Sequence, residues 1–199
     1  MKLVVLASGR GSNFAAIADA IARGEIPSSQ ILALICNKPG AAVLELAARR
    51  GIPSLIVDSG AYRREGRADR AAYEAELGRA LERLAPDYVC LAGYMLILGE
   101  ALVQRWAGKM LNIHPSLLPA FPGLHPQQQA LQAGALKTGC TVHWVAQAVD
   151  GGPTLAQAEV PILPGDTAQS LAQRLLPLEH TTYVKVLKKL AEDDVKQRR

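Results

Sequence analysis

The sequence near the N-terminus reads Leu3-Val4-Val5-Leu6-Ala7-Ser8-Gly9-Arg10-Gly11-Ser12-Asn13. Its first five residues are apolar and partly β-branched, which is typical of a short buried strand. The glycines and small polar residues that follow indicate a turn, and a helical pattern begins directly after it, at residues 13–23. A strand, a glycine-rich turn and a helix in this order indicate an α/β protein.

The same alternation continues along the chain. Apolar or β-branched runs predict strands at residues 3–7, 31–36, 54–57, 88–91, 110–114, 140–145 and 155–160. Helical patterns lie at residues 13–23, 41–50, 69–84, 100–105, 127–133 and 167–190. The early β-α-β-α-β order predicts an open, mostly parallel, Rossmann-like sheet with helices on both faces. The two last strands lie close together around Asp150-Gly151-Gly152-Pro153, which predicts an antiparallel C-terminal addition.

The last helical pattern carries local signals at both ends. Asp166, followed three positions later by Gln169, predicts the N-terminal cap. Pro177 is expected to kink the helix, because its ring removes a backbone donor and clashes with the preceding turn. The charged residues 192–199 predict a frayed tail. No repeat or linker divides residues 1–199, so we expect a single domain.

Composition narrows the class of protein. No apolar run approaches the roughly 20 residues of a membrane span, and no signal-peptide pattern follows Met1, so we expect a cytoplasmic protein without a membrane partner. The cysteines are widely spaced in apolar stretches, which predicts reduced, buried thiols. They are Cys36, Cys90 and Cys140. The formal net charge of +4 suits anionic ligands. A basic cluster is interpreted as a solvated helix face and not as a nucleic-acid site, because no basic residues interleave with aromatic ones. It consists of Arg63, Arg64, Arg67 and Arg70.

The glycine-rich turn at residues 8–13 suits an anion. Glycines let a backbone approach closely, and a helix N-terminus offers exposed N–H groups and a favourable dipole, so we expect a phosphate there. The turn lacks the GK[ST] ending of a Walker loop and the third glycine of the dinucleotide fingerprint. The second strand ends in Cys36-Asn37-Lys38, without the acidic residue that nicotinamide cofactors favour. A purely structural turn is about equally compatible with this pattern.

A second polar group lies in Asn112-Ile113-His114-Pro115-Ser116-Leu117-Leu118-Pro119. On a strand, Asn112 and His114 point to one face, because successive side chains alternate. The prolines cannot continue a sheet ladder, so the strand should end near His114, where sites in open α/β sheets usually lie. Asp150 can complete the group. A strand-end asparagine and histidine are, taken alone, more often surface or satisfied core residues.

Together these motifs resemble the phosphoribosylglycinamide formyltransferases, which are folate-dependent enzymes of purine synthesis. The resemblance is carried, in order and over nearly the whole chain, by residues 8–13, 91–95, 112–119, 122–125, 150–153 and 179–180. Methionyl-tRNA formyltransferases and formyltetrahydrofolate deformylases resemble it in the same polar core, but carry a further domain for which 199 residues leave no room.

The resemblance implies formyl transfer from 10-formyltetrahydrofolate, as co-substrate, to the amine of 5-phosphoribosylglycinamide. Asn112, His114 and Asp150 are then the catalytic residues. The amide suits a developing oxyanion, and an imidazolium could stabilise it and deliver a proton. A carboxylate beside His114 would favour the charged ring and raise its pKa. The family is similar in needing no metal, and no metal-ligand spacing occurs here.

The resemblance also implies the binding residues. In the N-terminal half, Gly11, Ser12 and Asn13 hold the ribotide phosphate, whereas Glu179 binds the ribose hydroxyls. The C-terminal half is then the catalytic and folate-binding part. The folate site draws on Arg70, Met95, Leu96, Ile97, Leu98, Asn112, Ala146, Gln147, Ala148, Val149 and Asp150. Roles for His125, His143 and His180 stay open, and either a monomer or a homodimer is expected.

Two positions depart from the pattern of the family. Many relatives have Met-Arg-Ile-Leu where this chain has leucine at position 96, and a basic residue where it has Ala120. Both changes remove positive charge near anionic ligands, which predicts an effect on affinity and not on activity. The alternative of a noncatalytic ribotide- or folate-binding module stays open on fold alone. It gives no reason for a proton-transfer group such as His114.

Overall fold

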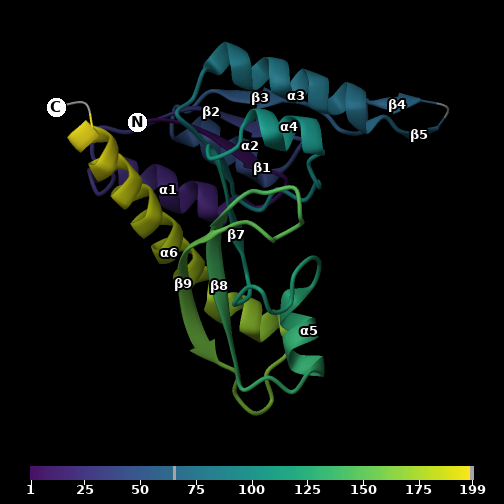
Figure 1. Cartoon of the computed structure of the whole chain (residues 1–199), viewed down its shortest axis with the longest axis vertical. Coiled ribbons are helices and arrows are strands. Elements are labelled where there is room, and N and C mark those ends of the chain that lie inside the picture. Colours follow the sequence, from purple (N-terminus) through teal and green to yellow (C-terminus); the bar gives the residue numbers. More distant parts are fainter. Residues whose placement is uncertain (65, 198–199) are drawn as a thin grey trace.

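A computed structural model describes residues 1–64 and 66–197. In this part of the chain a seven-stranded sheet has the order β3-β2-β1-β6-β7-β8-β9 (Figure 1). The strands are β1 (Lys2–Ala7), β2 (Gln30–Cys36), β3 (Ser54–Ile56), β6 (Tyr88–Leu91), β7 (Met110–His114), β8 (Lys137–Trp144) and β9 (Thr154–Pro161). Pairs from β3 to β7 are parallel, whereas β7 pairs antiparallel with β8, and β8 with β9. The predicted fold class is therefore confirmed.

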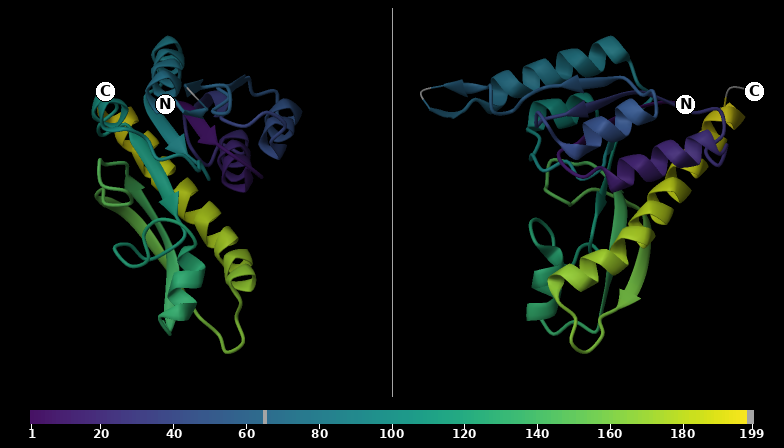
Figure 2. Two further views of the ribbon diagram at one scale, coloured as in Figure 1. Left: turned by 90° about the vertical axis from the view of Figure 1, so that its right-hand side faces the viewer. Right: turned by 180° about the vertical axis from the view of Figure 1, so that it is seen from behind.

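Helices cover both faces of the sheet (Figure 2). They are α1 (Ser12–Ala22), α2 (Ala42–Arg49), α3 (Arg70–Leu84), α4 (Glu100–Arg105), α5 (Pro126–Gln132) and α6 (Ala168–Gln197). Alternating side chains of β1 enter two different cores. Leu3 and Val5 pack in a core with α1, α2 and α6, while Val4 and Leu6 pack in a core with α3 and α4. Burial on both faces explains why β1 is a continuous apolar run.

A small hairpin beside α3 was not predicted. Its strands are β4 (Arg63–Arg64) and β5 (Arg67–Ala68), and the hairpin projects beyond the end of the main sheet (Figure 1). Gly66 allows the turn, with φ of 78°. Strands of two residues are too short to show alternation, so no pattern could reveal them. The interpretation of the basic cluster as a helix face was wrong for Arg63, Arg64 and Arg67, which lie in the hairpin, since only Arg70 lies in α3.

The last helix differs from its prediction at both ends. The cap lies one residue later than expected: Ser170 N–H donates to Thr167 Oγ1 at 3.1 Å, and Thr167 N–H donates to Ser170 Oγ at 3.0 Å. The helix continues through Pro177, and its axis bends in its first half (Figure 2). The frayed tail predicted from residue 192 was wrong up to residue 197, because the helix packs its far end on the sheet through buried Ala191. Residues 198–199 lie outside the described part.

Candidate active site

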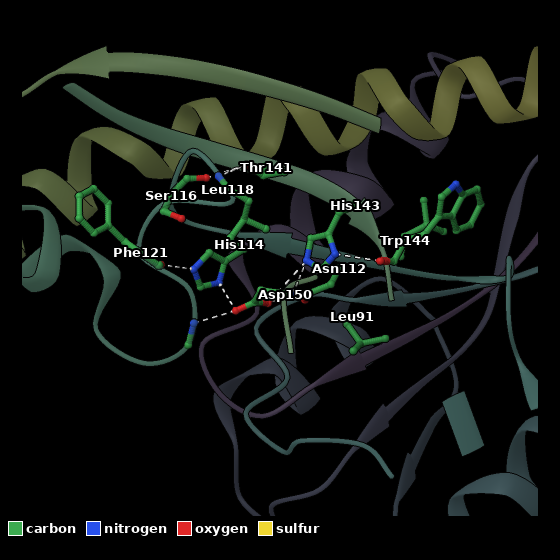
Figure 3. Close-up of polar contacts among 12 residues, drawn as sticks. Leu91, Asn112, His114, Ser116, Leu118, Phe121, Thr141, His143, Trp144 and Asp150 are labelled. Atoms are coloured by element: carbon green, nitrogen blue, oxygen red, sulfur yellow. Dashed lines mark hydrogen bonds and ion pairs between the residues drawn. The ribbon is translucent and has the colours of Figure 1, made fainter. Parts of the chain in front are cut away.

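The polar group of the sequence gathers at the carboxyl end of β7. This strand lies where the sheet changes from parallel to antiparallel, because β6 is its parallel neighbour and β8 its antiparallel one. Asn112 and His114 point to one side of it, as the alternation predicts, and Asp150 reaches them from the connection between β8 and β9 (Figure 3). The strand order reverses between β1 and β6, beside β7, and ligands of open α/β sheets usually bind outside the carboxyl ends of the strands near such a point.

Asp150 is the centre of the group. Its Oδ2 accepts a hydrogen bond from Gly123 N–H at 2.8 Å and lies 3.3 Å from His114 Nδ1. Its Oδ1 lies 3.5 Å from Asn112 Nδ2 and 3.6 Å from His143 Nε2. Burial raises the pKa of Asp150, but the imidazole of His143, the amide of Gly123 and the charge of His114 together bring it below its ordinary value. The carboxylate is therefore ionised at neutral pH.

His114 has an acceptor at each ring nitrogen. Its Nε2 lies 2.9 Å from the carbonyl oxygen of Phe121, to which only an N–H can donate, and its Nδ1 faces the carboxylate of Asp150. Both contacts are hydrogen bonds only when both nitrogens carry protons. The ring is 6% exposed, so water does little to weaken these contacts. The strand end thus presents the imidazole between two hydrogen-bond acceptors.

The loop after β7 is fixed by a buried hydroxyl. Thr141 Oγ1 accepts from Leu118 N–H at 3.0 Å and donates to the carbonyl of Ser116 at 2.7 Å (Figure 3). Gln157 Nε2 adds bonds to the same hydroxyl and to the carbonyl of Leu118. These contacts hold the loop against β8 and β9, and so place the Phe121 carbonyl against His114.

His143 is a member of the site that sequence reasoning left open. It lies on β8 directly opposite Asn112, and only 2% of it is exposed. Its Nδ1–H donates to the carbonyl of Trp144 at 2.9 Å, and its Nε2 lies 3.2 Å from Asn112 Nδ2 and 3.6 Å from Asp150 Oδ1. The histidine thus orients the amide of Asn112. Only the pairing register of β7 with β8 could have revealed it, and register is not readable from one strand.

A cavity of about 390 Å³ opens beside this group. It brings together Asn112, His114, Asp150 and His143 with mostly apolar loops. Of the predicted folate residues, it is lined by Met95, Leu96, Ile97, Leu98, Asn112, Ala146, Gln147, Val149 and Asp150. Neither Ala148 nor Arg70 lines it. Large apolar side chains remain open to solvent at this wall, with Met95 61% and Ile97 63% exposed. A cavity with an apolar wall and a few polar groups suits a flat organic ligand.

The glycine-rich turn lies next to this cavity. Gly11 precedes α1 with φ of 78°, and a Cβ there would lie 2.4 Å from Val43 Cγ2, so the position requires glycine on two grounds. Ser12 and Asn13 then form the first turn of α1. The hydroxyl oxygen of Ser8 accepts from Met95 N–H at 2.9 Å. The turn and the apolar wall of the cavity are therefore joined directly.

Glu179 reaches the turn from α6. Its Oε2 accepts from Asn13 Nδ2 at 2.8 Å, and the residue is 8% exposed, so it does not occupy an ordinary solvated position. Burial raises the pKa of Glu179, although the Asn13 hydrogen bond and the charge of Arg10 partly oppose this. Asn13 Oδ1 is buried and lacks a partner among the described residues. The structure thus brings Glu179 to the turn of Gly11, Ser12 and Asn13, although 166 positions separate it from Asn13 in the sequence.

Three further observations concern metal binding, membrane spans and the cysteines. Within residues 1–64 and 66–197, no three His, Cys, Asp or Glu side chains are grouped so that they could hold a metal ion. In the same part of the chain, no helix combines the length and apolarity that crossing a membrane requires. Cys36, Cys90 and Cys140 are free and buried, as expected.

Comparison with known proteins extends over the whole fold. The sequence pattern of the formyl transferase family matches residues 1–187. A phosphoribosylglycinamide formyltransferase from Escherichia coli (strain K12) is 41% identical over 196 residues, which cover 98% of this chain and 90% of that protein. The trifunctional purine biosynthetic protein adenosine-3 from Drosophila pseudoobscura pseudoobscura is 45% identical over 193 residues, 96% of this chain. The chain spans only 14% of the length of that relative.

Solved structures give the same result. Glycinamide ribonucleotide transformylase 1 from Symbiobacterium toebii has a TM-score of 0.90 at 41% identity, covering 97% of this chain and 88% of that one. A formyltetrahydrofolate deformylase from Pseudomonas syringae has a TM-score of 0.86 at 26% identity, covering 96% of this chain and 61% of that one.

Proposed function

Because the chain belongs to the formyl transferase family, we propose that it transfers the formyl group of 10-formyltetrahydrofolate to the amine of 5-phosphoribosylglycinamide, in purine biosynthesis. One observation carries the proposal. The Asn112, His114 and Asp150 group opens into an apolar cavity whose wall is hydrogen-bonded to a helix-capping glycine turn. A folate and a phosphorylated amine could thus meet at one strand end.

The reaction needs stabilisation of a negative oxygen. The amine nitrogen attacks the formyl carbon and forms a C–N bond, while the carbonyl electrons move to oxygen. The amide nitrogen of Asn112 carries two N–H groups, and the one that makes the long contact of 3.5 Å with Asp150 Oδ1 turns to that oxygen, while His143 orients the amide. The intermediate then collapses, the bond from carbon to the folate nitrogen breaks, and one amine proton passes to that nitrogen.

His114 and Asp150 act here as a charge pair. When both ring nitrogens of His114 carry protons, the ring stabilises the oxyanion at short range, and the ionised carboxylate holds the ring in place. Direct proton delivery from Nε2 requires the Phe121 carbonyl to release it, since that carbonyl accepts its hydrogen bond at 2.9 Å. The geometry therefore favours electrostatic stabilisation as the first role of His114.

The two substrates are assigned to the two parts of the site. Gly11, Ser12 and Asn13, in the N-terminal half, bind the phosphate through the exposed amides of α1, and Glu179 accepts hydrogen bonds from the ribose hydroxyls. The folate ring lies against residues 95–98 and 146–150, in the half that also holds the catalytic group. A single domain of residues 1–199, a cytoplasmic location and a monomer or homodimer stay predictions.

The test is direct. The purified protein is incubated with 10-formyltetrahydrofolate and glycinamide ribonucleotide, and the release of tetrahydrofolate is followed by absorbance, with His114→Ala as the inactive control. Release that requires the ribotide supports the proposal. Release without the ribotide would mean that water is the acceptor, as the name of the deformylase relative describes. No release in the presence of both substrates would leave the binding-module alternative and reject the proposal.

A further inference from the structure

The unexpected hairpin carries two arginines that have no ion-pair partner among the described residues. Arg63 in β4 and Arg67 in β5 are both exposed, and neither forms an ion pair with a carboxylate among residues 1–64 and 66–197. Arg70, at the start of α3, differs because its Nε donates to Glu74 Oε1 at 2.7 Å. The described part of the hairpin thus presents positive charge to solvent, on an arm that projects beyond the end of the main sheet (Figure 1).

Aromatic side chains tie the hairpin to the wall of the cavity. Tyr62, at its base, packs edge-on against Tyr73 of α3, with ring centroids 5.7 Å apart. The hydroxyl of Tyr73 hydrogen-bonds to that of Tyr94, and Tyr94 lines the cavity. The hairpin is closed at the same place by Asp69 N–H, which donates to the carbonyl of Tyr62 at 2.9 Å. Its position is therefore set by groups that also form the cavity wall.

A second connection runs through Glu74. Its Oε1 accepts from Arg70 Nε at 2.7 Å and from Gly99 N–H at 2.6 Å. Gly99 directly follows Leu98, which lines the cavity. The base of the hairpin and the rim of the apolar wall are thus neighbours. Arg70, the cation at the base of the hairpin, is already partly balanced by Glu74.

The cavity itself offers no cation to an anionic ligand tail. None of the described residues that line it is a lysine or an arginine. A folate ends in a glutamate, and further glutamates can be joined to the γ-carboxyl, each of which adds one carboxylate. These negative groups must find their partners outside the cavity, and unpaired cations on an exposed arm suit them.

We propose that the β4–β5 hairpin binds the oligo-γ-glutamyl extension of the folate, with Arg63 and Arg67 contacting carboxylates beyond the first. This inference rests on the proposed function and names the preferred form of its folate. A nucleic acid fits the hairpin less well, because Tyr62 packs against Tyr73 and no aromatic side chain of the described hairpin residues is free to stack on bases.

The experiment compares two folates in two variants. Arg63→Gln/Arg67→Gln removes the unpaired charges, and Arg49→Gln/Arg83→Gln removes the same net charge from exposed helix positions elsewhere. Calorimetric Kd values and KM values are measured for 10-formyltetrahydrofolate with one glutamate and with five, at about 0.02 M and about 0.5 M ionic strength. All of these residues lie on the surface, so both variants should fold.

The wild-type protein and the control variant should bind the pentaglutamate about three- to tenfold more tightly than the monoglutamate at low salt, the effect of two exposed charge contacts. The hairpin variant should lose this preference and keep its affinity for the monoglutamate. High salt should remove the preference in all three proteins.

An equal preference in the hairpin variant and the wild type would overturn the inference, and so would the absence of any preference in the wild type. In both cases turnover of the monoglutamate would show that the proposed function still stands. If neither folate binds the wild type, the proposed function itself fails, and the inference fails with it.

Discussion

Replacing Gly152 by alanine perturbs the connection that carries Asp150. An alanine Cβ at this position would lie 1.8 Å from the carbonyl oxygen of Trp144 and 2.8 Å from its carbonyl carbon. Cβ atoms essentially never approach other heavy atoms to less than 3.0 Å, so the contact with oxygen must open by at least 1.2 Å, the difference between 3.0 and 1.8. The neighbour is backbone, and no side-chain rotation can relieve the clash.

The size of the effect follows from the groups that must move. Trp144 accepts from His143 Nδ1–H at 2.9 Å and donates its own N–H to the carbonyl of Pro153 at 3.0 Å. Disturbing these two hydrogen bonds costs about 0.5–1.5 kcal/mol each, and overpacking adds about 1–3 kcal/mol. The free energy of unfolding should therefore fall by about 2–6 kcal/mol. A displacement of about 1 Å at the catalytic group should also lower turnover about 10²-fold.

Urea denaturation followed by tryptophan fluorescence measures the first effect, and the formyl-transfer assay measures the second. Gly78→Ala is the matched control, because its Cβ would make an ordinary contact, 3.6 Å from Leu102 Cδ1, inside α3. That variant should be stabilised by about 0.5–1 kcal/mol. Unfolding of Gly152→Ala at the wild-type urea concentration, with normal turnover, would refute the close-contact reasoning.

Four further outcomes test the site. His114→Ala should reduce kcat by roughly 10²–10⁴-fold with folate binding retained, and near-normal kcat would remove its catalytic role. Ser12→Ala should raise KM for the ribotide and leave KM for folate unchanged, whereas equal increases would argue against a phosphate site in the turn. Because the pKa of Asp150 is lowered from 3.8, its contribution to stability is present above that pH and lost as pH falls through the folded value. Denaturation curves of Asp150→Asn should therefore lack this acid-side loss, and an unchanged pH slope would contradict the shift. Glu179 has the opposite sign: its pKa is raised from 4.5, so its contribution is full below that pH and is lost as pH rises through the folded value. Glu179→Gln should gain stability relative to the wild type as pH rises above 4.5, and a difference that stays constant with pH would reject the raised pKa.

The resemblance seen in the motifs is confirmed by the relatives, and the fold class by the sheet. Alternation alone placed Asn112 and His114 on one face, because the strand period is fixed by backbone geometry. Asp150 approaches these two residues from a loop, where its own φ is 53°, and no periodicity in the sequence encodes that conformation. The family pattern supplied that residue, and the structure supplies its partners. Their roles in catalysis and binding stay predictions.

The features that the sequence missed depend on contacts between distant segments. His143 enters the site only through its register opposite Asn112. The last helix extends to Gln197 because Ala191 finds a buried place on the sheet, while its charged composition alone indicated fraying. The capping box consists of Thr167 and Ser170, one residue later than the predicted Asp166 and Gln169. Several small polar residues near this helix start can form such a cap, so the sequence alone does not determine which of them does.

The leucine at position 96, where many relatives have arginine, bears on the proposed role of the hairpin. The sequence predicted that the loss of a positive charge at this position would affect the affinity for an anionic ligand. In the structure Leu96 lines the cavity and packs against the core under α3, so its side chain adds to the apolar wall. Arg70 is already engaged with Glu74. If the proposal for the hairpin is right, the positive charge for the anionic end of a folate lies outside the cavity, on Arg63 and Arg67. If that division holds, Leu96→Arg should tighten binding of the monoglutamate and reduce the preference for the pentaglutamate. Calorimetry with both folates checks this. An unchanged preference for the pentaglutamate would show that position 96 and the hairpin do not affect binding of the same end of the folate.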